Sequence, residues 1–231
     1  MTPFNRFAAI LGIALVSAQA HAVDVSFTSG AGLAQNYGNT YTTTVDGLTI
    51  SASAWSSTAR ANQFEQAALT FTPGSGLGVC NSQEKANCSA KNFADALGNK
   101  GADDLILFKF SGAVTLQSLS MLQFGGDSDL SIWAGAGAFS PAGLKASLIG
   151  TATLYDNTSN VNAVKTVSLA SFTGSYDWIA VAARIGQNND FAKLQSLTIN
   201  PVAQPVPDAA TWMTMLAGLG LIGFRVSRRQ A

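Results

Sequence analysis

The stretch Leu105-Ile106-Leu107-Phe108-Lys109-Phe110, followed by Ser111-Gly112 and then by Val114-Thr115-Leu116-Gln117-Ser118-Leu119-Ser120-Met121, decides the fold class of this chain. Its first part is a short β-rich apolar run. Its last part alternates apolar and polar residues, which is typical of a strand with one buried face. Ser-Gly between two such runs predicts a turn. The stretch therefore predicts two successive strands, over residues 105–110 and 114–121.

The same kind of pattern extends outward in both directions. Residues 41–45 and 48–55 flank Asp46-Gly47, and this dipeptide predicts a hairpin with a type I′ turn, because both central residues of that turn need positive φ. Other strands are predicted at residues 23–28, 67–71, 129–133, 144–155, 164–169, 178–185 and 194–199. Residues 74–79 read as a Gly-rich loop, and residues 81–100 as a long loop with one helical turn near 93–97.

Roughly ten short strands without a long amphipathic helix predict an all-β domain. We expect an antiparallel β-sandwich of jelly-roll type, with a closed barrel as the alternative. No repeat of fixed period is visible, which argues against a propeller or a β-helix.

The N-terminus has the pattern of a secretory signal peptide. Arg6 precedes an apolar core over residues 7–16, and Ala20-His21-Ala22 ends the segment in an A-x-A pattern. Residues 1–22 are therefore expected to be removed by cleavage after Ala22, leaving Val23 as the first mature residue. An uncleaved anchor is the alternative, although the core is short for a membrane span.

The C-terminus has the pattern of a membrane-directed tail over residues 204–231, and residues 23–203 are the expected ectodomain. An uncharged, mostly apolar run of 16 residues, 209–224, would span roughly 24 Å as a single helix. That is a marginal transmembrane helix for a hydrocarbon core about 30 Å thick. The basic end that follows should stay cytoplasmic, which places the ectodomain outside.

This tail resembles the PEP-CTERM sorting domain. The resemblance rests on Val206-Pro207-Asp208, Trp212, the Leu/Gly-rich run 216–223, and Arg225, Arg228 and Arg229. It covers 27 residues and implies an exported protein of an exopolysaccharide-producing Gram-negative bacterium, whose tail is recognised and removed by an exosortase. Asp208 stands where Glu is usual in the family, and Ala209 where a second Pro is usual. A simple retained anchor is the alternative.

The composition of residues 23–203 excludes several classes of protein. Nine Lys/Arg and twelve Asp/Glu give a net charge of −3 with no basic cluster, so a nucleic-acid partner is not expected. His21 is the only histidine and precedes the predicted cleavage site. The mature chain therefore cannot build a Ser-His-Asp or Cys-His catalytic arrangement, or an imidazole-based metal site.

The two cysteines of the chain, Cys80 and Cys88, are separated by seven residues. An even number of cysteines in an exported chain predicts a disulfide, which would close a short loop. By the loop-entropy relation such a ring stabilises the fold by roughly 2.5 kcal/mol.

The acidic residues suggest two kinds of site. Asp103-Asp104 and Asp127-Ser128-Asp129 could supply oxygen ligands to a structural calcium, although they match no EF-hand or RTX loop, and turn-forming Asp residues are the alternative. No other cofactor is expected. A glycosidase would need two carboxylates across a sugar, and neither Glu65, Glu84 nor any of the Asp residues is marked as such a pair.

The aromatic residues suggest one further kind of site. Trp55, Trp133 and Trp178 could stack on sugar rings if exposed, but each lies in or beside an apolar strand pattern, which favours core packing.

Two functions follow. The first is a non-enzymatic surface or extracellular-matrix protein, sorted by an exosortase and associated with exopolysaccharide or biofilm. The alternative is a carbohydrate-binding module or a weak glycan-active protein acting on the cell's own polysaccharide. The segment 76–133 also loosely resembles domains that recur on PEP-CTERM proteins, which implies no defined activity.

Overall fold

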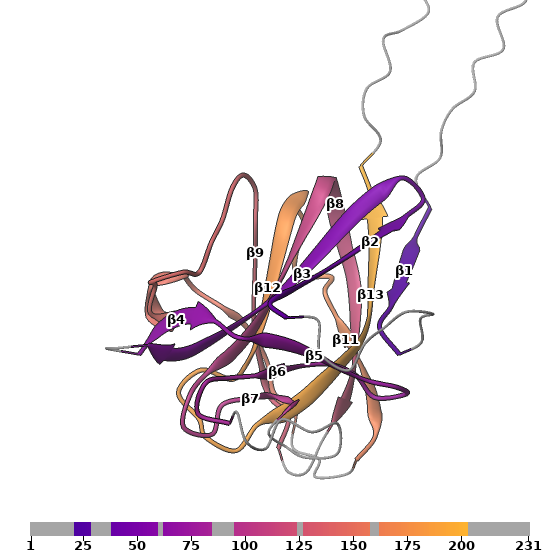
Figure 1. Ribbon diagram of the computed structural model, residues 1–231. Coiled ribbons are helices and arrows are strands. Elements are labelled where there is room, and N and C mark those ends of the chain that lie inside the picture. Colours follow the sequence, from indigo (N-terminus) through magenta and orange to yellow (C-terminus); the bar gives the residue numbers. More distant parts are fainter. Residues whose placement is uncertain are drawn as a thin grey trace, which may run out of the picture. The chain divides into compact units, whose positions relative to one another are not determined.

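The computed structural model describes residues 21–28, 38–59, 62–84, 95–123, 127–157 and 162–202. These residues form an all-β, antiparallel domain, and one compact unit runs from Ala20 to Val202 (Figure 1). Residues 1–20 of the predicted signal peptide and the predicted sorting tail lie outside the described residues. Among the described residues, no helix is long and apolar enough to cross a membrane.

Thirteen strands follow one another along the described part of the chain. They are β1 (Val23–Ser26), β2 (Thr40–Val45), β3 (Leu48–Ala59), β4 (Gln63–Gln66), β5 (Ala68–Thr72), β6 (Gly76–Cys80), β7 (Leu97–Gly98), β8 (Asp104–Gln123), β9 (Leu130–Gly135), β10 (Thr153–Tyr155), β11 (Val164–Ser168), β12 (Tyr176–Ala183) and β13 (Phe191–Pro201). One short 3₁₀ helix, Ala146–Leu148, lies between β9 and β10.

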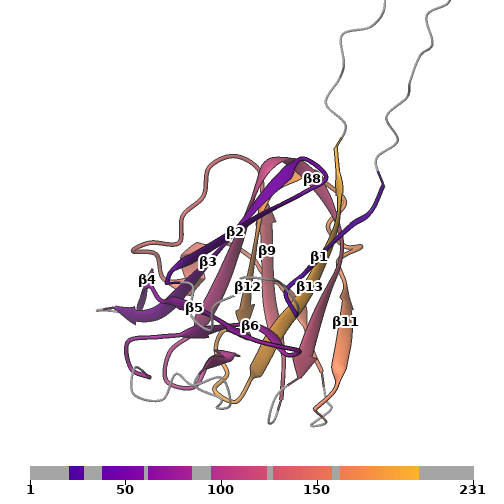
Figure 2. The same ribbon diagram turned by 45° about the vertical axis from the view of Figure 1, so that its right-hand side comes forward.

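β8 organises the sheet because its two halves have different neighbours. The first half pairs with β3 on one side and β12 on the other, and β12 continues to β9 and β10. The second half pairs with β11 and β13, and β13 also pairs with β1, β6 and β7. In Figures 1 and 2, β8 rises to the top of the domain and descends again, so that one half lies along each of these two groups of strands. The arrangement is consistent with a β-sandwich.

The predicted turn at Ser111-Gly112 is wrong, because β8 runs without interruption from Asp104 to Gln123. Pairing with β3 ends at Phe110, and pairing with β13 begins at Val114. The Ser-Gly pair therefore marks the place where one strand passes between two sets of partners. Gly112 is not among the residues with positive φ, so the strand changes direction there without a left-handed residue.

Three other expectations need correction. The segment 144–155 is not one long strand, since only Thr153–Tyr155 is extended as β10 and a 3₁₀ helix precedes it. The Gly-rich loop at residues 74–79 is mostly strand β6, and Leu97–Gly98 form the short strand β7 inside the predicted long loop. The strand β4 was not predicted. The remaining predicted strands are present, with ends shifted by a few residues.

The glycines of β6 have a packing role that explains why they occur in a strand. A Cβ on Gly78 would lie 1.7 Å from the carbonyl oxygen of Asp95, and one on Gly76 would lie 2.2 Å from that of Leu194. Since these contacts are to backbone, which cannot rotate away, only glycine fits. The glycines therefore allow a close approach of β6 to its neighbours.

The hairpin prediction is confirmed. β2 and β3 pair antiparallel from Val45↔Leu48 to Thr40↔Ser53, and Asp46 and Gly47 have φ of 50° and 78°. Both central residues are therefore left-handed, as a type I′ turn requires.

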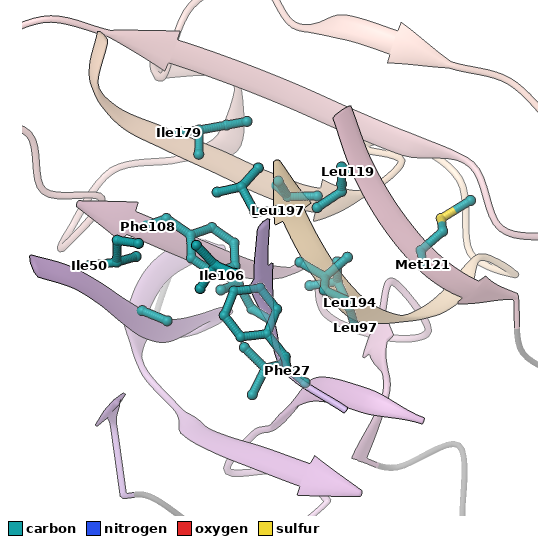
Figure 3. Close-up of a cluster of buried hydrophobic side chains, with 14 of the residues drawn as sticks. Phe27, Ile50, Leu97, Ile106, Phe108, Leu119, Met121, Ile179, Leu194 and Leu197 are labelled. Carbon is teal, nitrogen blue, oxygen red and sulfur yellow. The ribbon is translucent and has the colours of Figure 1, made fainter. Parts of the chain in front are cut away.

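The main core lies on one side of the first half of β8 and continues along its second half. In Figure 3, Phe27, Phe108, Leu119, Leu194 and Leu197 are among the side chains of this core. Phe27 stacks on Phe108 with ring centroids 5.4 Å apart. Apolar side chains at even positions up to 116, and at odd positions from 119, face this core, so the alternation shifts by one residue along β8. Register shifts against β13 accompany the change, as expected of a β-bulge.

A second, smaller core covers the opposite face of the first half of β8. Trp55, Trp133 and Trp178 pack there with Leu105 and Leu107. The connection between β9 and β10 covers these side chains with four apolar residues, Phe139, Ala146, Ile149 and Ala152. All three tryptophans are less than 10 % exposed, so the core interpretation is confirmed for them. None is available as an exposed sugar platform.

Candidate functional site

The loops at one end of the domain hold most of its buried acidic groups. Carboxylate oxygens of Asp127, Asp129 and Asp190 lie within 4.8 Å of one another, with Asp129 and Asp190 buried. Asp127 and Asp129 precede β9, and Asp190 precedes β13. The backbone brings the two loops together by a parallel bridge between Asp127 and Asp190.

Hydrogen-bond donors occupy the carboxylate oxygens of this acidic cluster. The Oδ1 of Asp190 accepts from the backbone N–H of Asp129 at 3.0 Å, and the Oδ1 of Asp129 accepts from the N–H of Asn157 at 2.6 Å. The guanidinium of Arg184 donates to the Oδ2 of Asp129 at 2.9 Å and to Asp156 at 3.1 Å. Arg184 thus supplies positive charge to the cluster, and its bonds to Asp156 and Asp129 raise its own pKa.

Asn99 connects the acidic cluster to the loop that leads into β8. Its Nδ2 donates to the Oδ2 of Asp190 at 2.6 Å and to the carbonyl of Arg184 at 2.8 Å. Its Oδ1 accepts from the backbone N–H of Asp190 at 2.9 Å. One side chain therefore fixes three groups of the β12–β13 loop. Burial raises the pKa of the Asp190 carboxyl, while these hydrogen bonds oppose the rise.

A polar cleft of about 410 Å³ lies beside Asn99. Three segments line it: the β12–β13 loop, the loop before β8, and residues on either side of the β3–β4 connection. The lining residues are Ser57, Asn62, Asn99, Gly101, Ala102, Asp103, Gly186, Gln187 and Asn188. The described lining residues include no large apolar or aromatic side chain, and Asp103 carries their one formal charge.

The backbone of the cleft is held in place while several of its side chains are left available. Ser57 and Asp103 exchange two bonds, since the Oγ of Ser57 accepts from the Asp103 N–H at 2.7 Å and the Ser57 N–H donates to the Asp103 carbonyl at 2.9 Å. Within the described part of the chain, the carboxylate of Asp103 and the amides of Asn62, Gln187 and Asn188 make no hydrogen bond. Partial burial raises the pKa of Asp103.

Positive φ angles recur around the cleft. Gly101 and Gly186 have φ of 86° and 88°, and Asn62 has φ of 56°. A non-glycine residue in the left-handed region is uncommon and often marks a functional or tightly constrained loop. These turns direct backbone groups and short polar side chains toward the same space.

A second group of carboxyls lies between β6 and β8. Asn81 donates through Nδ2 to the Oδ1 of the fully buried Asp104 at 3.2 Å, and its backbone N–H donates to Glu84 at 3.2 Å. Burial raises the pKa of Glu84 to about 7, and the negative charge of Asp95 adds to the rise. Burial and the charge of Glu84 raise the pKa of Asp104 well above its usual range.

Asp95 itself is paired with the buried Lys193. The Nζ of Lys193 lies 2.8 Å from the Oδ1 of Asp95 and donates to the hydroxyl of Thr72 at 2.8 Å. Burial lowers the pKa of Lys193, while Asp95 opposes the shift. The pair ties β13 to β5 inside the domain and is closed to solvent.

The structure rearranges the predicted acidic sites. Asp127 and Asp129 do lie together, but their third member is Asp190, and Asp103 and Asp104 are not part of that group. Asp103 lines the cleft instead, and Asp104 bonds with Asn81 and with the N–H of Gly98. Structural calcium stays a hypothesis, since the Asp127–Asp129–Asp190 cluster is not by itself evidence of a metal.

Other predicted site residues have the following positions. Cys80 ends β6 and is largely buried, while Cys88 lies outside the described residues, so their disulfide stays a prediction. Val23 begins β1 next to the predicted cleavage site, and Ala22 is exposed. Ala20 and the tail residues Val206, Pro207, Asp208, Trp212, Arg225, Arg228 and Arg229 lie outside the described residues.

Comparisons with known proteins give little. No family model matches the chain, and no curated protein matches it. Among solved structures, a truncated AlyQ with CBM32 and alginate lyase domains matches at 17% identity with a TM-score of 0.30, over 51% of this chain and 29% of that one. The match spans less than a third of the AlyQ chain.

Proposed function

We propose that the chain is a non-enzymatic protein, exported through the inner membrane and sorted by an exosortase through its C-terminal tail. In this proposal the tail holds the protein transiently in the membrane. Processing then leaves a jelly-roll-type β-sandwich at the cell surface or in an extracellular matrix rich in exopolysaccharide. The observation that carries the proposal is the pairing of an N-terminal signal pattern with Val206-Pro207-Asp208, Trp212 and three closing arginines.

The position of the two domain ends supports this proposal. Val23 pairs with Ile199, so the first residue of the expected mature chain lies beside the last residues of β13. Figure 1 shows β1 and the end of β13 next to each other at the same end of the domain. Signal-peptide cleavage and removal of the tail would therefore both act on segments that adjoin the same end of the domain.

The environment of the acidic and histidine side chains supports a non-enzymatic role. The Oε1 of Glu65 already accepts hydrogen bonds from Thr58 at 2.5 Å and from Ser82 at 3.2 Å. Asp104 is fully buried, and Glu84 bonds to the Asn81 backbone. His21 is exposed, with its Nε2 3.1 Å from Asp46, and would leave with the signal peptide. None of these groups is arranged as an acid and a nucleophile across an open site.

Sorting can be tested in the producing cells by changing the tail motif. Replacing Val206-Pro207-Asp208 with three alanines is expected to leave the precursor in the inner membrane and to deplete the surface and matrix fractions. The change Gln204→Ala, just before the motif, is the matched control and should be released like the wild type. Equal release of the triple variant, or equal release in cells lacking exosortase, would rule out exosortase sorting.

The alternative function is carbohydrate binding. The observation that favours it is the polar cleft, whose amide and carboxylate side chains have no partner within the described part of the chain. It is compatible with the first proposal, because a matrix protein can hold polysaccharide without chemically changing it.

A further inference from the structure

We propose that the polar cleft lined by Asn62, Asp103, Gln187 and Asn188 is a binding site for an uncharged, hydroxyl-rich glycan segment. This inference rests on the proposed function, because it assigns to an exported matrix protein the surface through which it would hold its polysaccharide. It adds a location, a set of residues and a charge preference that the proposed function does not contain.

The chemistry of the lining fits sugar hydroxyls. A hydroxyl both donates and accepts, and so does each amide side chain, through its NH₂ group and its carbonyl. Asn62, Gln187 and Asn188 offer three such amides with no partner within the described part of the chain. The unpartnered carboxylate of Asp103 adds an acceptor that can take hydrogen bonds from two neighbouring hydroxyls. Such charge-assisted bonds are the stronger kind.

The charge of the cleft decides between classes of glycan. Among the described residues that line the cleft, Asp103 is the one charged side chain, and it is negative when ionised. A uronate or a sulfated sugar would bring a second negative charge close to it, and like charges at short range repel. The described lining residues also include no lysine or arginine to pair with an acidic sugar. An uncharged glycan is not repelled by Asp103 and needs no cationic partner.

The framework of the cleft is prepared for binding. Asn99 is fully engaged with Asp190 and with the Arg184 carbonyl, so it fixes the β12–β13 loop and is not itself a free ligand group. The backbone of Asp103 is tied to Ser57 by two hydrogen bonds. A ligand would therefore meet loops that are already ordered, which lowers the entropic cost of binding.

The cleft is also placed where a polymer can reach it. The β12–β13 loop precedes the first residue of β13, and the tail follows its last residue, Pro201. Ten residue steps of about 3.3 Å separate these ends by roughly 33 Å. Glycan at the cleft would therefore lie at the opposite end of β13 from the residue that the tail follows.

Binding can be measured with the processed protein recovered from the surface fraction, or with the full chain in detergent. The probes are neutral dextran, the cell's own exopolysaccharide, and alginate as a polyuronate. We expect retention on at least one of the first two, and at least tenfold weaker retention on alginate.

Three variants separate the cleft from the rest of the surface. Gln187→Ala with Asn188→Ala should weaken binding at least tenfold, which corresponds to the loss of one or two hydrogen bonds. Asp103→Asn, which keeps the shape, should reduce the preference for neutral glycan over alginate. Asn189→Ala, exposed in the same loop but outside the lining, should bind like the wild type.

The outcomes also separate this inference from the proposed function. A protein that is correctly processed and surface-located, yet binds neither dextran nor its own exopolysaccharide, contradicts the glycan site and leaves sorting intact. Binding that survives the double variant, or that favours alginate, overturns the cleft assignment. Cleft-dependent binding by a protein that is never processed would support the site and contradict exosortase sorting.

Discussion

Val23, the first residue of β1, is the antiparallel partner of Ile199 near the end of β13. Both side chains are buried in the main core, and the pairing continues through Val25↔Leu197 to Ser26↔Ser196. The start of the expected mature chain is thus part of the fold and not a free end. A cleavage after Ala22 leaves β1 whole, whereas trimming a few residues further would remove a strand.

This relationship predicts that the first mature residues are important for stability. Phe27 follows β1, is 1% exposed and stacks on Phe108. Phe27→Ala is expected to lower the free energy of unfolding by about 3–5 kcal/mol, through lost burial and a residual cavity. Asp24→Asn, on the exposed face of β1, should change it by less than about 0.5 kcal/mol. Urea denaturation measures both, and equal effects of the two changes would contradict the burial of this segment.

The close approach of β6 to the Asp95 backbone predicts a strong effect at Gly78. Gly78→Ala places a methyl group where the Asp95 carbonyl lies, so the free energy of unfolding should fall by more than about 3 kcal/mol. Gly112→Ala is the matched control, because its nearest atom is a Leu48 methyl at an ordinary 3.7 Å and its φ is not positive. The free energy of unfolding of this control should stay within about 1 kcal/mol of the wild-type value. A tolerated Gly78→Ala would show that the two backbones are further apart.

The raised pKa of Glu84 predicts a stability that falls with pH. The unfolded carboxyl titrates near 4.5 and the folded one near 7, so the folded state binds this proton more tightly. Its stabilising contribution is therefore complete below about pH 4.5 and is lost as pH rises through about 7. Each pKa unit corresponds to about 1.4 kcal/mol, and solvent screening at this half-buried group reduces the expected loss to roughly 1–2 kcal/mol.

Urea denaturation at pH 5 and pH 8 checks this expectation. Glu84→Gln cannot ionise and should flatten the dependence. Asp104→Asn should also reduce it, because the buried Asp104 carboxyl, whose own pKa is raised well above its usual range, no longer titrates. If the free energy of unfolding of Glu84→Gln still falls between pH 5 and pH 8 as much as that of the wild type, a group other than Glu84 causes the pH dependence.

The acidic cluster predicts a specific response to calcium. Arg184 donates to Asp129 and Asp156, and backbone or amide donors occupy Asp129 and Asp190. We expect millimolar calcium to leave the melting temperature of the wild type unchanged. Arg184→Gln removes the positive charge and should lower the melting temperature, and calcium should then restore part of it. If calcium instead releases or takes up heat on titration into the wild type and raises its melting temperature, the protein has a calcium site.

The parts of the fold that depend on neighbouring residues could be predicted from the sequence. The Asp46-Gly47 hairpin is determined by two φ angles and by the residues directly beside it. Ser111-Gly112 has the same local composition as a turn, but its conformation is decided by β3, β12 and β13, which pair with β8 from distant parts of the chain. Local patterns cannot distinguish a turn from a strand that changes partners.

The candidate site was harder to predict for a related reason. Asp127 and Asp129 can be predicted as neighbours because they are close in sequence. Asp190, the third member of the cluster, is 61 residues beyond Asp129 and lies in a loop of turn-forming residues. The cleft combines amides from three such loops, and Asn-rich turns are common without any ligand. The run Gln187-Asn188-Asn189-Asp190 is the one visible signal in the sequence, and only the structure shows that Gln187 and Asn188 line the same cleft as Asp103.

The central claim is that this chain is an exported passenger whose two terminal address segments are removed. Intact mass spectrometry of the protein from the surface fraction tests it most directly. We predict a species that begins at Val23 and lacks the residues beyond about Pro207. A surface species that still carries Met1–Ala22, or one that still ends in Arg228-Arg229-Gln230-Ala231, would contradict the account.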